Sequence, residues 1–391
     1  MIQVELYIAA IFWFAVLLLL HAYLIYPFSL RIFKLFKSRP FTADQDYFPS
    51  ISILIAAYNE EKVIAERIEN IKNLNFDFGK LELIIGSDCS SDRTSEIVQS
   101  KSKDYNWLKC VNFEQRRGKA TVLNDLFKTA KNDILVFSDA NTKFNKDALV
   151  KLVSEFDDQK VGGVCGRLVL EEPADDFDKT NRERLYWQYE TQLKKLEGNL
   201  GTLIAANGGI YAIRKKLFTK FPVQVAITDD LFQTLAVLQQ GFQFLYKYDA
   251  IAVEEVSKEI ITEFRRKVRF ATTNFQTLKF FGGLLIPKKI LLSYAFFSHK
   301  VIRWFVPLLL ILLLITNALL IDHQYFYKII FYFQIGFYVS ALVGFILNKL
   351  KINISIFSII YYYVFTNLAL LIGLYKFLMR KQVYIWNSTP R

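Results

Sequence analysis

An acidic residue and an amide follow an apolar run near the middle of the chain. Residues 134–138 (ILVFS) are typical of a buried strand, and Asp139 and Asn141 come directly after it. Because strand residues i and i+2 point to the same side, both side chains are expected to share one ligand. Their oxygen atoms suit a divalent cation, Mg²⁺ or Mn²⁺. A simpler interpretation is that Asp139 only caps a helix at the strand end.

A second acidic pair, Asp229 and Asp230, follows Ile227 and Thr228 and opens a helical run. An acid beside another acid and against apolar residues has a raised proton affinity, which suits a general base near neutral pH. The alternative is that Thr228 or Asp229 caps the helix, and the two interpretations are compatible.

Two glycines and a basic run complete the residues that could act in chemistry. Gly208 and Gly209 would let a ligand approach the backbone closely, or would only allow a tight turn. The run at 265–269 (RRKVR) supplies Arg266 and Arg269, which would neutralise a phosphate leaving group or bind a membrane surface.

The elements that position these residues alternate between strand and helix over residues 50–165. Apolar runs at 50–58, 81–87 and 134–138 are each followed by a helical pattern. This order predicts an α/β fold with a mostly parallel sheet. Ligands of such sheets bind beyond the carboxyl ends of the strands, where Tyr58-Asn59-Glu60, Asp88 with Asp92, and Asp139 with Asn141 stand. The sequence contains neither GxGxxG nor GxxxxGK[ST].

The remaining parts of the chain are too apolar for an ordinary soluble protein. Of its 391 residues, 53% are hydrophobic and 16% aromatic. A membrane-spanning helix needs about 20 apolar residues, and we expect four, at 7–28, 304–321, 325–347 and 352–375. Residues 276–300 are expected to form an amphipathic segment at the membrane interface.

The charged residues that flank the apolar segments predict the orientation of the chain in the membrane. Residues 7–28 have an acidic start and basic residues after them, which indicates an uncleaved anchor with the following domain in the cytoplasm, at the inner (plasma) membrane. The basic C-terminal tail would then lie outside, so its orientation stays open. The net charge of +12 favours membrane lipids as partners over nucleic acid. The three cysteines have no metal-ligand spacing.

Seven motifs together resemble family 2 glycosyltransferases, which are inverting enzymes with a GT-A nucleotide-sugar-binding domain. The resemblance covers roughly residues 50–275, and flanking membrane helices are typical of the membrane-bound polysaccharide synthases of this family. The motifs are ISILIAAYNEEKVI, IIGSDCSSDRT, RGKATVLND, FSDANT, ANGGIYAIRKKLF, ITDDLFQTLAVLQQG and EFRRKVRF.

The resemblance implies roles for individual residues on the nucleotide side. Ala57, Tyr58 and Glu60 would line the nucleotide pocket, and Asp88 would hydrogen-bond the uracil of a UDP-sugar. Arg117 and Lys119 would form the basic pair near the nucleotide.

It also implies roles at the reacting centre. Asp139 and Asn141 match the DxD-type metal motif, and Asp230 matches the general base of the acidic pair Asp229-Asp230. Arg266 and Arg269 match the family's QxxRW motif, which holds the diphosphate side of the product.

Three positions depart from the family pattern. Asn141 replaces an aspartate and removes one negative charge from the metal site, and Cys89 stands where glycine is usual. Phe270 replaces the tryptophan that helps to stack a growing sugar chain in processive synthases. This last change leaves a polymer product and a single transfer both open.

The expected protein is a membrane-bound inverting glycosyltransferase of the hexosyltransferase type. It moves a sugar from a nucleotide donor, expected to be UDP-linked, to a polysaccharide or glycolipid acceptor at the inner membrane face. The alternatives are single-sugar transfer to a lipid carrier and a non-catalytic scaffold with a decayed site. Donor sugar, linkage, acceptor, oligomeric state and any export partner protein stay open. The expected domains are an anchor (1–30), a basic linker (31–49), the catalytic domain (50–275), the interfacial segment (276–300), about three membrane helices (301–378) and a tail (379–391).

Overall fold

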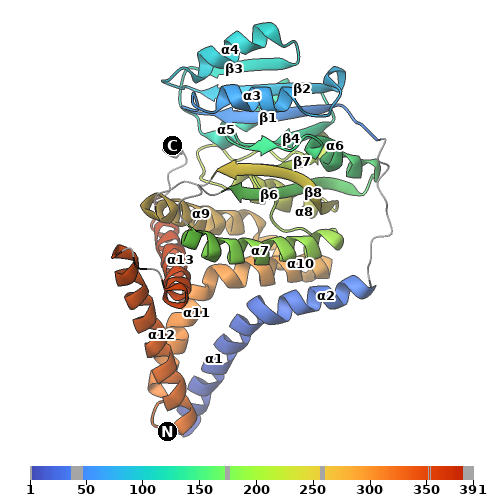
Figure 1. The fold of residues 1–391 in the computed structure, drawn as a ribbon. Helices are drawn as coiled ribbons and strands as arrows, with labels where there is room; N and C mark the ends of the chain where they lie inside the picture. The colour runs from blue at the N-terminus through green and yellow to red at the C-terminus, as the bar shows by residue number, and fades with distance from the viewer. Residues whose placement is uncertain are drawn as a thin grey trace.

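The computed structural model of the chain describes two regions stacked on each other. Figure 1 shows a sheet with helices on both faces above a layer of long helices that narrows into a bundle. Part of the expected linker and most of the expected tail lie outside the described residues. The described ranges are 2–36, 47–171, 177–255, 260–350, 352 and 354–381.

The upper region is built on one sheet, which has eight strands among the described residues, in the order β3-β2-β1-β4-β7-β6-β8-β5. Pairs β3-β2, β2-β1, β1-β4 and β6-β8 are parallel, whereas β4-β7, β7-β6 and β8-β5 are antiparallel. The expected mostly parallel α/β sheet is therefore confirmed, with an antiparallel part that the sequence did not predict. The strands are β1 (Ile51–Ala57), β2 (Leu81–Asp88), β3 (Leu108–Phe113), β4 (Ile134–Phe137), β5 (Lys143–Phe144), β6 (Val161–Glu171), β7 (Tyr211–Arg214) and β8 (Gln243–Glu255).

Strand β1 is fully buried because both faces of the sheet are covered by helices. Ile51, Ile53 and Ile55 belong to one core cluster, whereas Leu54 and Ala56 belong to the opposite one, as strand alternation requires. Helices α3 (Ile64–Lys72), α4 (Thr94–Asp104) and α6 (Ala148–Val153) supply the first cluster; α5 (Lys119–Thr129), α7 (Phe177–Asn199) and α8 (Asp229–Gln239) supply the second.

Four helices in the described part of the chain are long and apolar enough to cross a membrane, as expected from the sequence. The segment expected at the membrane interface, residues 276–300, continues directly into one of these helices, because α10 passes through a π-helical turn into α11. In Figure 1, α2 and α10 lie across the layer below α7, and α11 descends from it. The elements are α1 (Ile2–Leu20), α2 (Tyr26–Phe36), α10 (Ile290–Phe296), α11 (Ile302–Leu319), α12 (Tyr325–Lys349) and α13 (Ser355–Leu378).

Helix α9 (Ile260–Phe281) links the two regions and runs across the expected domain boundary at 275/276. Its Thr272 hydroxyl donates to the Gly373 carbonyl of α13 at 3.3 Å, so α9 packs closely on a membrane helix. Its Thr273 hydroxyl lies 2.6 Å from that of Thr228, just before α8. A shift of the membrane helices would therefore move α9 against the catalytic region.

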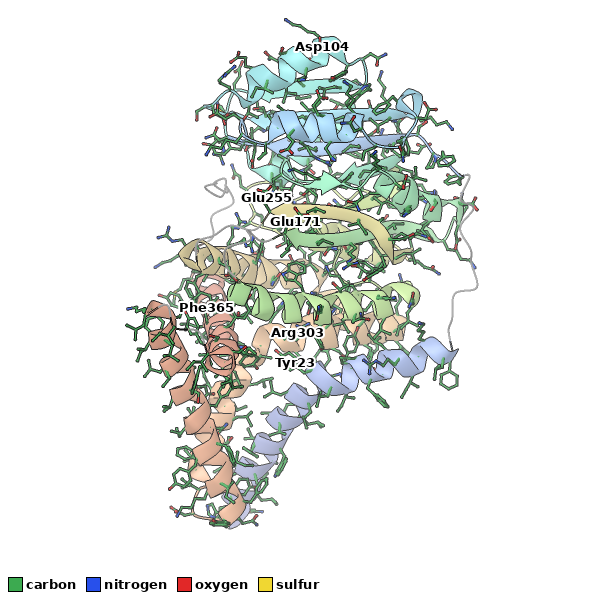
Figure 2. All side chains as sticks on the ribbon, viewed as in Figure 1. Tyr23, Asp104, Glu171, Glu255, Arg303 and Phe365 are labelled. Carbon is green, nitrogen blue, oxygen red and sulfur yellow. The ribbon has the colours of Figure 1, made fainter. Side chains whose placement is uncertain are left out.

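A buried ionic cluster joins α7 to the helices below it. Glu197 accepts from the Tyr26 hydroxyl at 2.6 Å and contacts His299 Nδ1 at 2.7 Å. Glu190 contacts His299 Nε2 at 3.2 Å and pairs with Arg303 at 2.6 Å. Figure 2 labels Arg303 at this junction. Because these groups are removed from water, each depends on its partners.

Replacing Glu197 with leucine is expected to destabilise this junction. Removing one partner from a buried ionic contact costs about 3–5 kcal/mol, because the groups left behind lose their compensation. Thermal unfolding of purified protein in detergent should show a midpoint lowered by about 5 °C or more. Gln192→Ala, on the exposed side of the same helix, is the matched control. Equal melting of the two variants would contradict a stabilising role for the cluster.

Candidate active site

A cavity of about 510 Å³ lies beside the carboxyl ends of β1 and β4 and extends to the membrane helices. Its wall includes Ala56 of β1 at one end and Trp304 of α11 and Tyr362 of α13 at the other. Most of the residues singled out from the sequence line it: Glu60, Lys119, Asp139, Asn141, Gly208, Gly209, Asp229, Asp230, Arg266 and Arg269.

Asp139 and Asn141 lie in a turn and not on the strand, which corrects the expected placement. Strand β4 ends at Phe137, so strand alternation does not govern these two side chains. The turn is fixed at its start by Ser138, whose hydroxyl donates to the Gly209 carbonyl at 2.8 Å. Both side chains still line the cavity, because the turn carries them there together.

Two carboxylates, those of Asp139 and Asp230, converge on Gly208, and Asp229 is joined to Asp139 through Lys119. The Lys119 ammonium lies 2.7 Å from Asp139 Oδ1 and 3.1 Å from Asp229 Oδ2. A Cβ atom placed on Gly208 would lie 3.3 Å from Asp230 Oδ2 and 3.8 Å from Asp139 Oδ2, so these two oxygens are no more than about 7 Å apart. They face the same point, which the missing side chain of Gly208 leaves open.

Gly208 and Gly209 are the central residues of a turn, in which the Ile210 N–H donates to the Asn207 carbonyl at 3.0 Å. Neither has a positive φ, whereas Gly118, Gly201 and Gly241 do. A Cβ atom on Gly209 would lie 2.9 Å from the Thr142 hydroxyl, closer than such atoms normally come. The expected tight turn is therefore present, and at Gly209 the close approach of Thr142, not the backbone conformation, requires glycine.

The charges around Gly208 shift the protonation of their neighbours. Burial raises the pKa of Asp230 and the charge of Asp229 raises it further, to about 6, although Lys119 acts in the opposite direction. Burial alone would lower the pKa of Lys119, but the charges of Asp139 and Asp229 outweigh it and hold that pKa above its usual range. Asp230 can thus accept a proton near neutral pH while Lys119 stays charged.

The start of α8 presents both acids of the pair. Asp229 and Asp230 occupy the first helical turn, where the helix dipole favours negative charge. Thr228 holds the N-cap position, but its hydroxyl contacts Thr273 and makes no capping hydrogen bond. Capping by the Thr228 side chain is therefore wrong, and its hydroxyl ties α8 to α9 instead.

Helix α9 supplies the cations of the cavity wall. Burial and the neighbouring Arg266 lower the pKa of Arg269, whereas the charges of Asp139 and Asp229 act to raise it. Arg269 therefore lies within electrostatic range of both acids. Phe270, in the place of the family's tryptophan, also lines the cavity.

The residues present fit a divalent cation that is held jointly with a phosphate-bearing ligand. Among the described residues, no group of three or more His, Cys, Asp or Glu side chains could hold a metal alone. Asp139 offers a carboxylate, and Asn141 keeps its amide oxygen available because its amide nitrogen donates to Glu254 at 3.0 Å. Magnesium is commonly bound by one or two carboxylates together with substrate phosphates.

Four residues singled out from the sequence form a separate group outside the cavity wall: Ala57, Tyr58, Asp88 and Arg117. Asp88 accepts the backbone N–H groups of Arg117 and Gly118 at 2.7 and 2.9 Å. The Arg117 side chain turns away to Asp125, at 2.7 Å. It is Arg116, which the sequence did not single out, that lies 3.2 Å above the Tyr58 ring and 3.4 Å from Asp88.

The loops after β1 and β2 are held by their own side chains. Asn59 and Cys89 have φ values of 53° and 56°, in the left-handed region, which explains why glycine suits the position of Cys89. Asp92 accepts the backbone N–H groups of Thr94 at 3.0 Å and Glu61 at 3.1 Å. Asp92 therefore ties the two loops together and does not face the cavity.

Several residues of the site gave no local signal in the sequence. Arg67 of α3 is 1% exposed and donates to the Ser138 hydroxyl at 3.0 Å, directly under the turn that carries Asp139. Glu190, Lys194 and Lys300 line the membrane end of the cavity. Each comes from a helix whose register is set by packing against distant parts of the chain.

Comparison with known proteins identifies the catalytic region. Residues 52–220 match the family model described as glycosyl transferase family 2. The chain carries a family 2 glycosyltransferase domain. Among curated relatives, the probable glycosyltransferase YdaM of Bacillus subtilis is 29% identical over 265 residues, which are 64% of this chain and 62% of the relative.

Two further similarities extend beyond the family 2 domain. The poly-beta-1,6-N-acetyl-D-glucosamine synthase of Staphylococcus epidermidis is 26% identical over 335 residues, 82% of this chain and 79% of the synthase. The solved mannosyltransferase PcManGT of Pyrobaculum calidifontis matches 95% of this chain and 100% of its own, with a TM-score of 0.72 and 21% identity. This likeness confirms the expected fold, a GT-A domain with membrane-type helices.

Asp88→Asn is expected to loosen the loop before α5. The amide places an N–H donor against the backbone N–H groups of Arg117 and Gly118, and each buried group left without a partner costs about 1–3 kcal/mol. Limited digestion with trypsin should then cut faster after Arg116 and Arg117. Asp104→Asn, at the exposed end of α4 (Figure 2), is the control. Unchanged cleavage at both arginines would show that the loop does not depend on Asp88.

Proposed function

We propose that this protein transfers a sugar, with inversion, from a UDP-linked donor to the hydroxyl of a polysaccharide or glycolipid acceptor. The observation that carries the proposal is the placement of Asp139 and Asp230 beside Gly208, with Asp229 joined to Asp139 through Lys119 and with Arg269 within electrostatic range of Asp139 and Asp229. Such a site offers a base, an open point for the reacting sugar and cations for the departing diphosphate. No other grouping in the cavity combines these three functions among the described residues.

Asp230 acts as the base. Inverting transfer requires the acceptor hydroxyl to lose its proton as its oxygen attacks the anomeric carbon, and a pKa of about 6 keeps Asp230 ionised at neutral pH. Asp229 holds that pKa up by its charge and is itself paired with Lys119. Asp229 is therefore a positioning residue for the base.

The cations of the wall stabilise the leaving diphosphate. Arg266 and Arg269 stand on α9 opposite the carboxylates, and fixed positive groups in such a site favour the charge that develops on the leaving oxygen. Asp139 and Asn141 would hold a divalent cation, Mg²⁺ or Mn²⁺, which when bound neutralises the diphosphate further. The PcManGT structure contains GDP-mannose and Mn²⁺, which supports the same arrangement here.

The nucleoside of the donor is expected beside the cavity, at the carboxyl ends of β1 and β2. Ala57, Tyr58, Asp88 and Glu60 frame this region, and Asp88 retains lone pairs for the uracil beyond its bonds to the loop. Arg116 covers the Tyr58 ring and replaces Arg117 as the basic residue of this group.

Two alternatives concern the product. Phe270 lines the cavity where a tryptophan stacks the chain in processive synthases, which favours transfer of a single sugar to a lipid carrier. The likeness to a poly-N-acetylglucosamine synthase favours a polymer. A non-catalytic scaffold is disfavoured, because the acids and their balancing cations are all present. The catalytic region would face the cytoplasm at the inner membrane.

Release of UDP by purified protein in lipid, tested across a panel of UDP-sugars with Mg²⁺ or Mn²⁺, decides the proposal. Asp230→Asn and Asp139→Ala should each lower release with the preferred donor by about 10²-fold to 10⁴-fold. Asp133→Asn, an exposed acid just before β4, should leave it unchanged. Absence of release with every donor, from folded protein, would reject the enzymatic function.

The pH dependence tests the base. Only ionised Asp230 can accept the proton, so kcat/KM should fall about tenfold per pH unit below pH about 6 and level off above it. Lys119 lowers the pKa of Asp230, so Lys119→Met should move this acidic limb to higher pH. A limb that stays in place in Lys119→Met would assign it to another group.

A further inference from the structure

We infer that the membrane end of the cavity is a site for an anionic, phosphate-bearing lipid acceptor, held by Lys194 and Lys300. The inference rests on the proposed function and adds the chemical class of the acceptor. The cavity that holds Asp230 is also lined by Lys194 of α7, by Lys300, just before α11, and by Trp304 and Tyr362. Figure 1 shows α7, α10 and α11 where the catalytic region meets the lower helices.

The acids near the membrane end of the cavity already have hydrogen-bond partners. Glu190, which lines it, directs one oxygen to Arg303 at 2.6 Å and the other to His299 at 3.2 Å. Glu197, behind the wall, contacts His299 and the Tyr26 hydroxyl. Both acids act on the charge of Lys300, but neither forms a salt bridge with Lys194 or Lys300 among the described residues.

The two lysines, by contrast, have no carboxylate partner in the described parts of the chain. The Lys194 ammonium donates to the neutral amide oxygen of Asn207. The side chain of half-buried Lys300 makes no hydrogen bond or salt bridge with the described residues, although the charges of Glu190 and Glu197 act on it. Two ammonium groups in a partly buried wall without carboxylate partners make an anionic ligand favourable there.

The membrane end of the cavity also connects the reacting centre with the apolar membrane helices. Lys194 acts on the charge of Asp230, so the first lysine lies near the base. Trp187, Trp304 and Tyr362 complete the wall, and aromatic side chains of this kind are typical of the boundary between headgroups and hydrocarbon. An acceptor with a hydroxyl, a phosphate and an acyl or polyprenyl chain would meet these three zones in that order.

The transfer step forms one bond and breaks one bond at the anomeric carbon, and it moves one proton. The hydroxyl oxygen of the lipid forms a bond to the anomeric carbon, and the bond from that carbon to the donor's diphosphate oxygen breaks. The electron pair leaves with the nucleoside diphosphate, and the hydroxyl proton passes to Asp230. The lipid phosphate, held by Lys194 and Lys300, does not react.

The experiment compares phosphatidylglycerol, which carries a hydroxyl and a phosphate, with neutral diacylglycerol. Both are supplied in nanodiscs with brominated chains, and quenching of tryptophan fluorescence reports binding independently of turnover. Wild-type protein should prefer the anionic lipid, and Lys300→Gln should reduce that preference about tenfold. Lys300→Arg, which keeps the charge, should retain it. If Lys300→Gln does not fold, Lys194→Gln gives the same comparison.

The control is Lys288→Gln, which removes an exposed charge of the same membrane-facing region. Equal loss in this variant, or no loss in Lys300→Gln, would overturn the inference in favour of general surface attraction. A higher KM for the nucleotide sugar, with lipid binding unchanged, would overturn it by assigning the lysines to the donor. Selective binding without turnover of any donor would retain the lipid site and reject the proposed function.

Discussion

Electrostatic repulsion among the carboxylates at Gly208 is the constraint on which the rest of the site depends. Two unit charges no more than about 7 Å apart repel by at least about 2 kcal/mol at an effective dielectric constant of about 20. Asp139 follows β4, whereas Asp229 and Asp230 begin α8, so two distant segments bring the charges together. Lys119 of α5 compensates two of them directly. Burial and the charge of Asp229 raise the pKa of Asp230, although Lys119 acts to lower it, and this gives the base its chemistry.

The same compensation makes the catalytic region dependent on the membrane helices. Arg269 reaches the acids from α9, and α9 is fixed on one side by the contact of Thr272 with Gly373 of α13. On the other side Thr273 contacts Thr228 at the start of α8. The cations and the acids are thus positioned by packing between the two regions, and neither region alone completes the site. The buried cluster around His299 fixes α7 to the same layer.

The sequence predicted what depends on local pattern. Apolar runs identified β1, β2 and β4, and the polar residues after them identified the edge of the sheet where the cavity lies. Side-chain directions after a strand ends depend on the turn, so the strand argument for Asp139 and Asn141 failed although both reach the cavity. In a similar way, it is Arg116 that lies over the Tyr58 ring, whereas the adjacent Arg117, which the sequence singled out, pairs with Asp125.

What the sequence could not predict depends on contacts between distant elements. Strand β6 (Val161–Glu171) contains glycines and polar residues and is ordered by β7 and β8, so it has no clear local period. Lys194 and Lys300 are 106 positions apart and meet only in the folded cavity. Lys194 lies near Asp230, on whose charge it acts, and Lys300 lies near Glu190. The donor diphosphate could also bind the ammonium groups of Lys194 and Lys300. The cations of α9 must therefore bind it more strongly than these lysines do. Arg266 and Arg269, which can each form paired hydrogen bonds with phosphate oxygens, meet that requirement better than single lysine ammonium groups.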